Sequence, residues 1–167
     1  MSPSKHCSRV WKQDGSEFCI GISLHGPDFR RACAQTIQAG DLEQIVSFYA
    51  DPLVAFDIMP PLQFKDLAKY KEIAWKQTFV NHFQFPITYQ VVDRRIHAED
   101  EIAFAHGFLR VEGVSKKGEA MEMWMRNTTC LQRIGERWKI SHGHNSIPIE
   151  TDTMKGMSNL ELVLLVH

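Results

Sequence analysis

The chain has 167 residues, which is the size of one ordinary globular domain. Hydrophobic residues make up 44% and charged residues 23%, so the composition excludes a disordered, collagen-like or coiled-coil chain. The net charge of -1 comes with neither a basic excess nor a basic stripe, so we expect no nucleic-acid partner and no attraction to an anionic membrane.

Cysteine usage and the apolar runs indicate the compartment. Cys7, Cys19, Cys33 and Cys130 form no C-x-x-C pair and no zinc-ligand spacing, which favours a reducing environment. The start of the chain lacks the apolar run of a secretory signal peptide, and the longest apolar stretch, 162–166, is far shorter than the roughly 20 residues of a membrane span. We therefore expect a cytoplasmic protein without a membrane partner.

The first part of the chain predicts an extension followed by two helices. Residues 1–27 show no sustained period and end in a Gly-Pro break, so we expect an N-terminal extension, poorly ordered apart from one short strand at 18–24. A helical period begins at Asp28, and Gly40 is a typical helix stop. Asp41 then precedes a second apolar stripe at helical spacing.

The remainder of the chain predicts a strand, a third helix and then a meander. Residues 53–59 predict a short strand, and Asp66 is the expected N-cap of a helix that runs to about Phe79. Four extended segments separated by polar turns follow, at 87–92, 102–111, 121–131 and 137–142. Helices followed by an antiparallel meander predict an α+β domain over 28–160, with 161–167 as a C-terminal tail.

The order of elements and two strand motifs resemble a known family. The entry from Ala39 to Asp57, the last strand Trp138-x-Ile-x-His-x-His-x-Ser and the preceding Trp124-x-Arg-x-Thr resemble SnoaL-like proteins of the nuclear transport factor 2-like superfamily, which includes ketosteroid isomerase. The resemblance covers about 28–160. It implies a cone-shaped barrel whose N-terminal helices pack on a curved, mainly antiparallel sheet around a deep pocket, in a homodimer, but it implies no single chemistry.

Two rows of side chains are expected to face that pocket, because residues two apart on a strand share a face. The rows are Trp138, Ile140, His142, His144 and Ser146 on the last strand and Trp124, Arg126 and Thr128 on the strand before it. An apolar floor below imidazoles and a hydroxyl is typical of a ligand pocket, and Trp75 is a candidate for its roof. The alternative is that the histidines hydrogen-bond within a filled core.

Asp57 is the candidate general base. It lies on the first predicted strand with Leu53, Ala55 and Met59 on the same face, where burial would raise the pKa of its carboxyl towards a working range. Its spacing from the Gly40-Asp41 helix junction is similar to that of the aspartate base of ketosteroid isomerase. We expect Arg126 to hold developing negative charge and His142 or His144 to donate or relay a proton. The alternative is a structural ion pair between Asp57 and Arg126.

Two departures from ketosteroid isomerase limit the chemistry. Cys33 and Thr128 stand where that enzyme has its oxyanion-hole tyrosine and its buried carboxylic acid, which argues against ketosteroid isomerisation itself. The resemblance implies instead isomerase, cyclase or dehydratase chemistry on a small apolar carbonyl or hydroxylated ring compound. That chemistry would be acid–base catalysis without a metal or another cofactor.

Two alternatives to this enzyme remain open. The domain would be a non-catalytic ligand-binding or assembly module if aromatic side chains filled the pocket. It would be a metal-dependent enzyme if His142 and His144 held zinc or iron with a third ligand such as Asp57, His106 or Asp93.

A methionine stripe bears on assembly. Met121, Met123 and Met125 alternate on the face opposite Trp124, so we expect this stripe outside the pocket, buried against a partner subunit.

Overall fold

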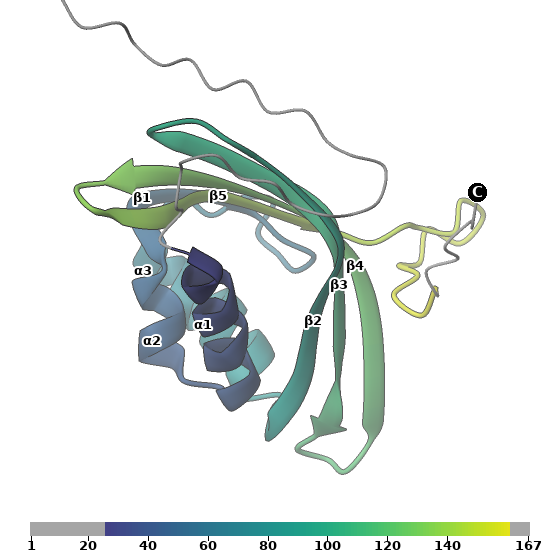
Figure 1. Cartoon of the computed structure of the whole chain (residues 1–167). Coiled ribbons are helices and arrows are strands. Elements are labelled where there is room, and N and C mark those ends of the chain that lie inside the picture. The colour runs from purple at the N-terminus through teal and green to yellow at the C-terminus, as the bar shows by residue number, and fades with distance from the viewer. Residues whose placement is uncertain (1–25, 161–167) are drawn as a thin grey trace, which may run out of the picture.

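The computed structural model describes residues 26–160, so residues 1–25 of the extension expected over 1–27, its short strand and the tail 161–167 lie outside the described residues. The helical elements are α1 (Gly26–Ala39), α2 (Leu42–Ser47), α3 (Leu67–Tyr70) and the π-helix η1 (Lys71–Val80). The strands are β1 (Tyr49–Phe56), β2 (Phe83–Ala98), β3 (Ile102–Ser115), β4 (Ala120–Ile134) and β5 (Arg137–Ser146). The predicted α+β architecture is confirmed, and the helices lie on the concave side of a bent sheet (Figure 1).

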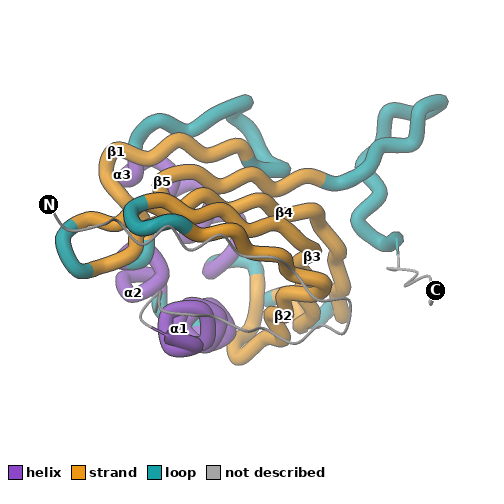
Figure 2. The backbone as a smooth tube through the Cα atoms, turned by 45° about the horizontal axis from the view of Figure 1, so that its top comes forward, coloured by secondary structure: helices purple, strands orange, loops and turns teal. Residues whose placement is uncertain are grey.

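The strands form one sheet in the order β1-β5-β4-β3-β2. Strands β2 to β5 make the predicted antiparallel meander, while β1 pairs with β5 in parallel. The sheet is curved but does not close into a barrel, and the helices cover its open concave side (Figure 2). The chain after β5 projects away from the sheet.

Local signals position the helices as the sequence predicts. Helix α1 ends at Gly40, whose φ of 72° is in the left-handed region that glycine tolerates. The Asp41 side chain caps α2 by accepting a hydrogen bond from the backbone N–H of Gln44, and Asp66 caps α3 in the same way through Lys69. The third helix differs from the expectation in one respect, because after its first turn it continues as a π-helix.

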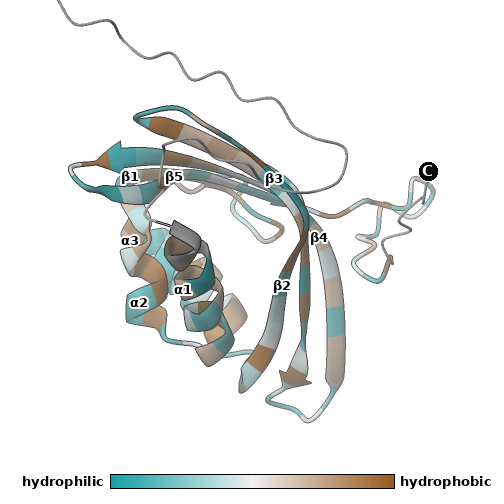
Figure 3. Ribbon diagram, in the orientation of Figure 1, coloured by the Kyte–Doolittle hydropathy of each residue, from teal (hydrophilic) through white to brown (hydrophobic). Residues whose placement is uncertain are grey.

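The core lies between the helices and the concave face of the sheet. Polar and apolar residues alternate along the strands, as expected for a sheet with one packed face (Figure 3). Three clusters of buried side chains fill the interior, and their fully buried members include Ile45, Leu53 and Val111. The same concave face carries the candidate site.

A bulge in β5 exchanges the faces of its side chains. Leu131 of β4 pairs with Ile140, but Cys130 pairs with His142, so Ser141 is an extra residue without a partner. Before the bulge, Ile140 faces the concave side, and after it Asn145 does. The rule that residues two apart share a face therefore fails across Ser141.

A second bulge lies in β2. Val92 pairs with Phe108 and Arg95 pairs with His106, so Asp93 and Arg94 together oppose Gly107. Asp93 has a φ of 46°, a left-handed conformation that aspartate tolerates better than most residues. A side chain at position 107 would lie 2.9 Å from the backbone oxygen of Val92, so glycine permits the close approach.

The N-cap of α3 gives a stability prediction. We expect Asp66→Ala to lower the free energy of unfolding by about 1 kcal/mol, because the Lys69 N–H loses its acceptor. Urea unfolding followed by circular dichroism measures the change. Asp152→Ala, at an exposed position in the loop after β5, is the control and should leave stability unchanged; equal stability of the two variants would contradict the capping role.

Candidate functional site

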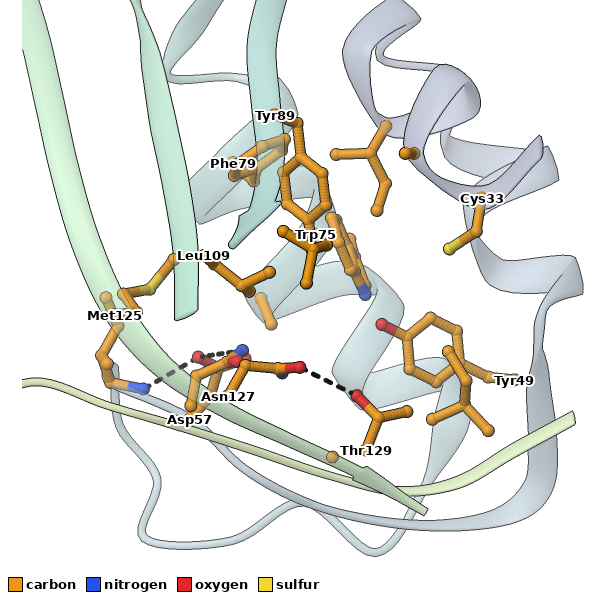
Figure 4. A pocket seen from close by; sticks show the side chains of 18 of the residues that line it. Cys33, Tyr49, Asp57, Trp75, Phe79, Tyr89, Leu109, Met125, Asn127 and Thr129 are labelled. Carbon is orange, nitrogen blue, oxygen red and sulfur yellow. Dashed lines mark hydrogen bonds between the residues drawn. The ribbon is translucent and has the colours of Figure 1, made fainter. Parts of the chain in front are cut away.

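A cavity of about 280 Å³ lies between the helices and the concave face of the sheet. This volume is near the lower end of the range for small-molecule sites, roughly 300–1,000 Å³. Most of the lining side chains are apolar or aromatic, among them Cys33, Trp75, Phe79, Tyr89, Leu109 and Met125 (Figure 4). The cavity is therefore suited to a small and largely apolar molecule.

The Asp57 carboxylate lies on one wall of this cavity. One oxygen, Oδ1, accepts hydrogen bonds from the backbone N–H of Ile58 at 2.9 Å and from Nδ2 of Asn145 at 3.2 Å. The other, Oδ2, accepts one from the Tyr70 hydroxyl at 2.8 Å. A carboxylate has about four acceptor sites, so Oδ2 keeps one lone pair for a further proton donor.

A chain of amides orients the donor from β5 (Figure 4). The Thr129 hydroxyl donates to Oδ1 of Asn127 at 3.1 Å, and Nδ2 of Asn127 donates to Oδ1 of Asn145 at 2.8 Å. The carbonyl oxygen of Asn145 is thereby engaged, which leaves its Nδ2 directed at Asp57. The polar wall is thus one connected network over β4, β5 and the end of β1.

Burial raises the pKa of Asp57 above its ordinary value of 3.8. The hydrogen bonds from Ile58, Tyr70 and Asn145 and the nearby His144 oppose this effect but do not cancel it. Burial also raises the pKa of Tyr70 well above its usual range, so that hydroxyl stays a neutral donor. A carboxylate with this environment is a suitable general base near neutral pH.

Other titratable side chains line the cavity at a distance from this wall. Burial raises the pKa of the Cys33 thiol to about 11, although Arg94 lowers it in part, so the thiol is protonated at neutral pH. Burial also raises the pKa of Tyr49 well above its usual range. Arg94 lines the cavity because the β2 bulge turns it towards the concave face.

Asp57 is also reached from outside the cavity. Together with Ile58 and Asn145 it lines a groove on the outer side of the molecule, where His144 and Ser146 lie. The carboxylate therefore stands between the cavity and the surface, which gives its proton a route to solvent.

Trp75 carries an unsatisfied donor. Its side chain is 9% exposed and lines the cavity. Over residues 26–160, its indole Nε1 is the one buried side-chain nitrogen or oxygen without a hydrogen-bond partner. A buried donor left in this state costs about 1–3 kcal/mol.

Three of the predicted site residues line the cavity and six do not. Asp57, Trp75 and Trp138 line it as expected. The expectation that the two strand rows face the interior is wrong for the whole row on β4 and, on β5, for the residues beyond Ile140. The residues concerned lie on the outer face: Trp124, Arg126, Thr128, His142, His144 and Ser146. On β5 the physical reason is the bulge at Ser141. On β4 the odd-numbered residues face the cavity, whereas the even-numbered ones were expected to.

The predicted partners change accordingly. Arg126 is exposed on the outer face, so the carboxylate of Asp57 is held by neutral donors rather than by that guanidinium. Nδ1 of His142 lies 2.9 Å from the backbone oxygen of Val54. His106 is exposed and stacks on Phe104.

The methionine stripe lies on the opposite face from the one expected. Met121, Met123 and Met125 line the cavity instead of covering a subunit interface. Because this face of β4 points inward, the polar residues that continue it, Asn127 and Thr129, point inward as well.

The polar side chains of the site that the sequence did not predict include Tyr70, Arg94, Asn127, Thr129 and Asn145. One available signal was a glycine inside each of two strands, because such a glycine often marks a bulge. Gly107 opposes the β2 bulge, and Gly143 follows the β5 bulge.

Two absences concern the described range alone. Between residues 26 and 160, no group of three histidine, cysteine, aspartate or glutamate side chains is arranged to hold a metal ion. Of the helices in this range, none has the length and apolar character needed to cross a membrane.

The family profile of the SnoaL-like domain matches residues 28–150. The chain therefore belongs to the SnoaL-like domain family. This confirms the resemblance drawn from the strand motifs. The comparison with curated proteins gave no match.

Solved structures share the fold. An NTF2-like protein of unknown function from Pseudomonas putida KT2440 is 27% identical, with 85% of this chain and 100% of that chain covered and a TM-score of 0.71. A ketosteroid isomerase-like protein from Erwinia carotovora atroseptica SCRI1043 is 13% identical over 70% of this chain and 88% of that chain, with a TM-score of 0.58. The association domain of C. elegans CaMKII is 12% identical over 71% of this chain and 89% of that chain, with a TM-score of 0.56. The last two are likenesses of fold alone.

The raised pKa of Asp57 gives a prediction about stability. A carboxyl whose pKa is higher in the folded than in the unfolded state stabilises the fold below its unfolded pKa, and this contribution is lost as the pH rises through the folded pKa. We therefore expect the stability of Asp57→Asn relative to the wild type to be greater at about pH 7 than at about pH 4. Urea unfolding at both pH values measures this difference, and a difference independent of pH would contradict it.

Proposed function

We propose that this protein binds a small, largely apolar carbonyl or hydroxylated ring compound and moves a proton on it by acid–base catalysis, as an isomerase, cyclase or dehydratase. The observation that carries the proposal is a hydrogen-bonded carboxylate with a raised pKa on the wall of an apolar cavity. The SnoaL-like family and the ketosteroid isomerase-like neighbour support the same class of chemistry.

Asp57 is the proposed general base. Its Oδ2 has one lone pair left and takes a proton from the carbon beside the ligand carbonyl, while the electron pair of that C–H bond moves towards the carbonyl and forms an enolate. The donors from Ile58, Tyr70 and Asn145 hold the carboxylate in one orientation throughout. The protonated Asp57 then returns the proton to a carbon of the enolate.

This mechanism replaces the acids expected from the sequence. His142 and Arg126 lie on the outer face, so we assign them no contact with a ligand in the cavity. His144 lies in the outer groove beside Asp57, where its charge lowers the pKa of that carboxyl. We propose that it tunes Asp57 rather than acting on the substrate.

Hydrogen–deuterium exchange on a ketone tests the base. We expect the protein to accelerate exchange of the acidic protons of 2-tetralone in D2O, and Asp57→Asn to slow this exchange by about 10²- to 10⁴-fold. The wild-type rate should rise with pH through a midpoint above 3.8, since only the carboxylate accepts a proton. Proton NMR of the ketone measures the rate.

The control is Asp51→Asn, at an exposed aspartate on β1, the strand that ends just before Asp57; this variant should catalyse exchange at the wild-type rate. Binding of 2-tetralone without accelerated exchange would reject the enzyme and favour the alternative, a non-catalytic ligand-binding module.

We further propose that the outer sheet face forms a homodimer interface. An outer aromatic band draws on four of the five strands, all except β4, and consists of Phe56, His97, Phe104, His106, His142 and His144. The rings form two groups on either side of β4, with centroids 5.0 Å apart for Phe56 and His142 in one group and 4.7 Å apart for His97 and Phe104 in the other. Phe104 is nevertheless 45% exposed, and exposed apolar groups gathered on one face are typical of an interface.

The oligomeric state tests this second proposal. We expect light scattering to give twice the chain mass of 19.2 kDa for the wild type and the single mass for Phe104→Glu, because a charge would be buried at the interface. The matched control is Leu62→Glu in the loop after β1, which is 95% exposed and should remain dimeric. A wild-type monomer would refute the interface.

The cysteines within the described residues support the proposed cytoplasmic location. Cys33 and Cys130 are both free thiols, as a reducing compartment maintains them.

A further inference from the structure

The unpartnered indole N–H of Trp75 points into the cavity that also contains Asp57. In Figure 4 its nitrogen lies at the cavity end of the ring, towards the space between Leu109 and Tyr49. The side chain is 9% exposed and its Nε1 has no partner within the described part of the chain. A donor that remains unpaired in an apolar cavity indicates a missing acceptor.

The surrounding rings fix this orientation. The Trp75 ring packs edge-on against Phe79, Tyr49 and Tyr70, with centroid distances of 5.3, 6.1 and 6.4 Å. The π-helix η1 holds its backbone, and the 2.8 Å bond from the backbone N–H of Asn81 to the oxygen of Lys76 shows the wide spacing of that helix. The indole therefore presents its N–H to whatever occupies the cavity.

We propose that Trp75 donates a hydrogen bond to the oxygen of the bound ligand, and that the ligand is a cyclic ketone held by this bond with an acidic C–H towards Asp57. The inference rests on the proposed function, because it uses the same cavity and the same base. Trp75 thereby becomes a substrate-binding residue that selects a carbonyl oxygen.

The chemistry of the two groups determines the orientation of the ligand. Indole N–H is a donor only, so its partner must be an acceptor, and a carbonyl oxygen that becomes an enolate oxygen meets this need at every stage of the proposed reaction. An ionised Asp57 is an acceptor only, so a carbonyl oxygen gains nothing from it. As Asp57 removes the proton, negative charge grows on the ligand oxygen and the hydrogen bond from Trp75 strengthens. The apolar walls between them suit the hydrocarbon part of a ring.

A matched pair of probes isolates this hydrogen bond. The probes are 2-tetralone and tetralin, which share a bicyclic skeleton and differ in the carbonyl group. Trp75→Phe keeps an aromatic ring and removes the N–H. We expect this variant to bind 2-tetralone about tenfold more weakly, as for the loss of one hydrogen bond in a dry site, and to bind tetralin within about twofold of the wild type. NMR titration measures both affinities.

The control variant is Trp124→Phe. Trp124 lies on the outer face, and its indole N–H donates to Glu122 at 3.2 Å. Its removal should change neither affinity. A direct measurement on the wild type needs no substitution in the cavity. With ¹⁵N-labelled tryptophan, the Trp75 indole N–H resonance should move downfield when 2-tetralone binds and much less when tetralin binds.

The outcomes separate this proposal from the proposed function. Equal binding of 2-tetralone by the wild type and Trp75→Phe, or an indole resonance that responds alike to both probes, would overturn the role of Trp75. If Asp57→Asn still slowed exchange in that case, the proposed function would stand. If the wild type bound neither probe and exchanged no protons of 2-tetralone, both proposals would be refuted.

Discussion

A carboxylate removed from water must be compensated by donors, and the compensation of Asp57 ties the structure together. Its three donors come from separate parts of the fold: the backbone after β1, Tyr70 at the end of α3 and Asn145 in β5. The position of α3 depends in turn on its cap, and the orientation of Asn145 depends on the amide of Asn127 in β4. The helices and the sheet therefore meet at one group, which is also the group best placed to react.

The bulge in β5 decides which chemistry reaches that group. In a regular strand, His142 and His144 would continue the inward row of Trp138 and Ile140, and the wall would carry imidazoles. The extra residue Ser141 turns them outward and brings Asn145 inward instead. The bulge in β2 does the same for Arg94. Two extra residues thus replace a pair of titratable acids with a neutral amide donor and add one cation, without changing the topology of the sheet.

These bulges mark the limit of what the sequence predicts. Helix ends at Gly40, Asp41 and Asp66 depend on neighbours within one turn, so they could be predicted locally, and so could the burial of Asp57 after an apolar strand. The face of each strand residue depends on pairing with another strand, which spacing within one strand does not report. For the same reason the methionines of β4 were expected outside, although they line the cavity.

The residues singled out from the sequence are distributed over both faces of the sheet. Most residues of the strand motifs, including Arg126, Thr128 and His144, belong to the outer face, whereas Trp138 of the same motifs lines the cavity together with Asp57 and Trp75. The outer face carries exposed aromatic side chains, and an exposed apolar patch of this kind is typical of an interaction site. We therefore propose that the outward residues of these motifs serve assembly, and that the chemistry belongs to the aspartate and the indole that line the cavity, Asp57 and Trp75.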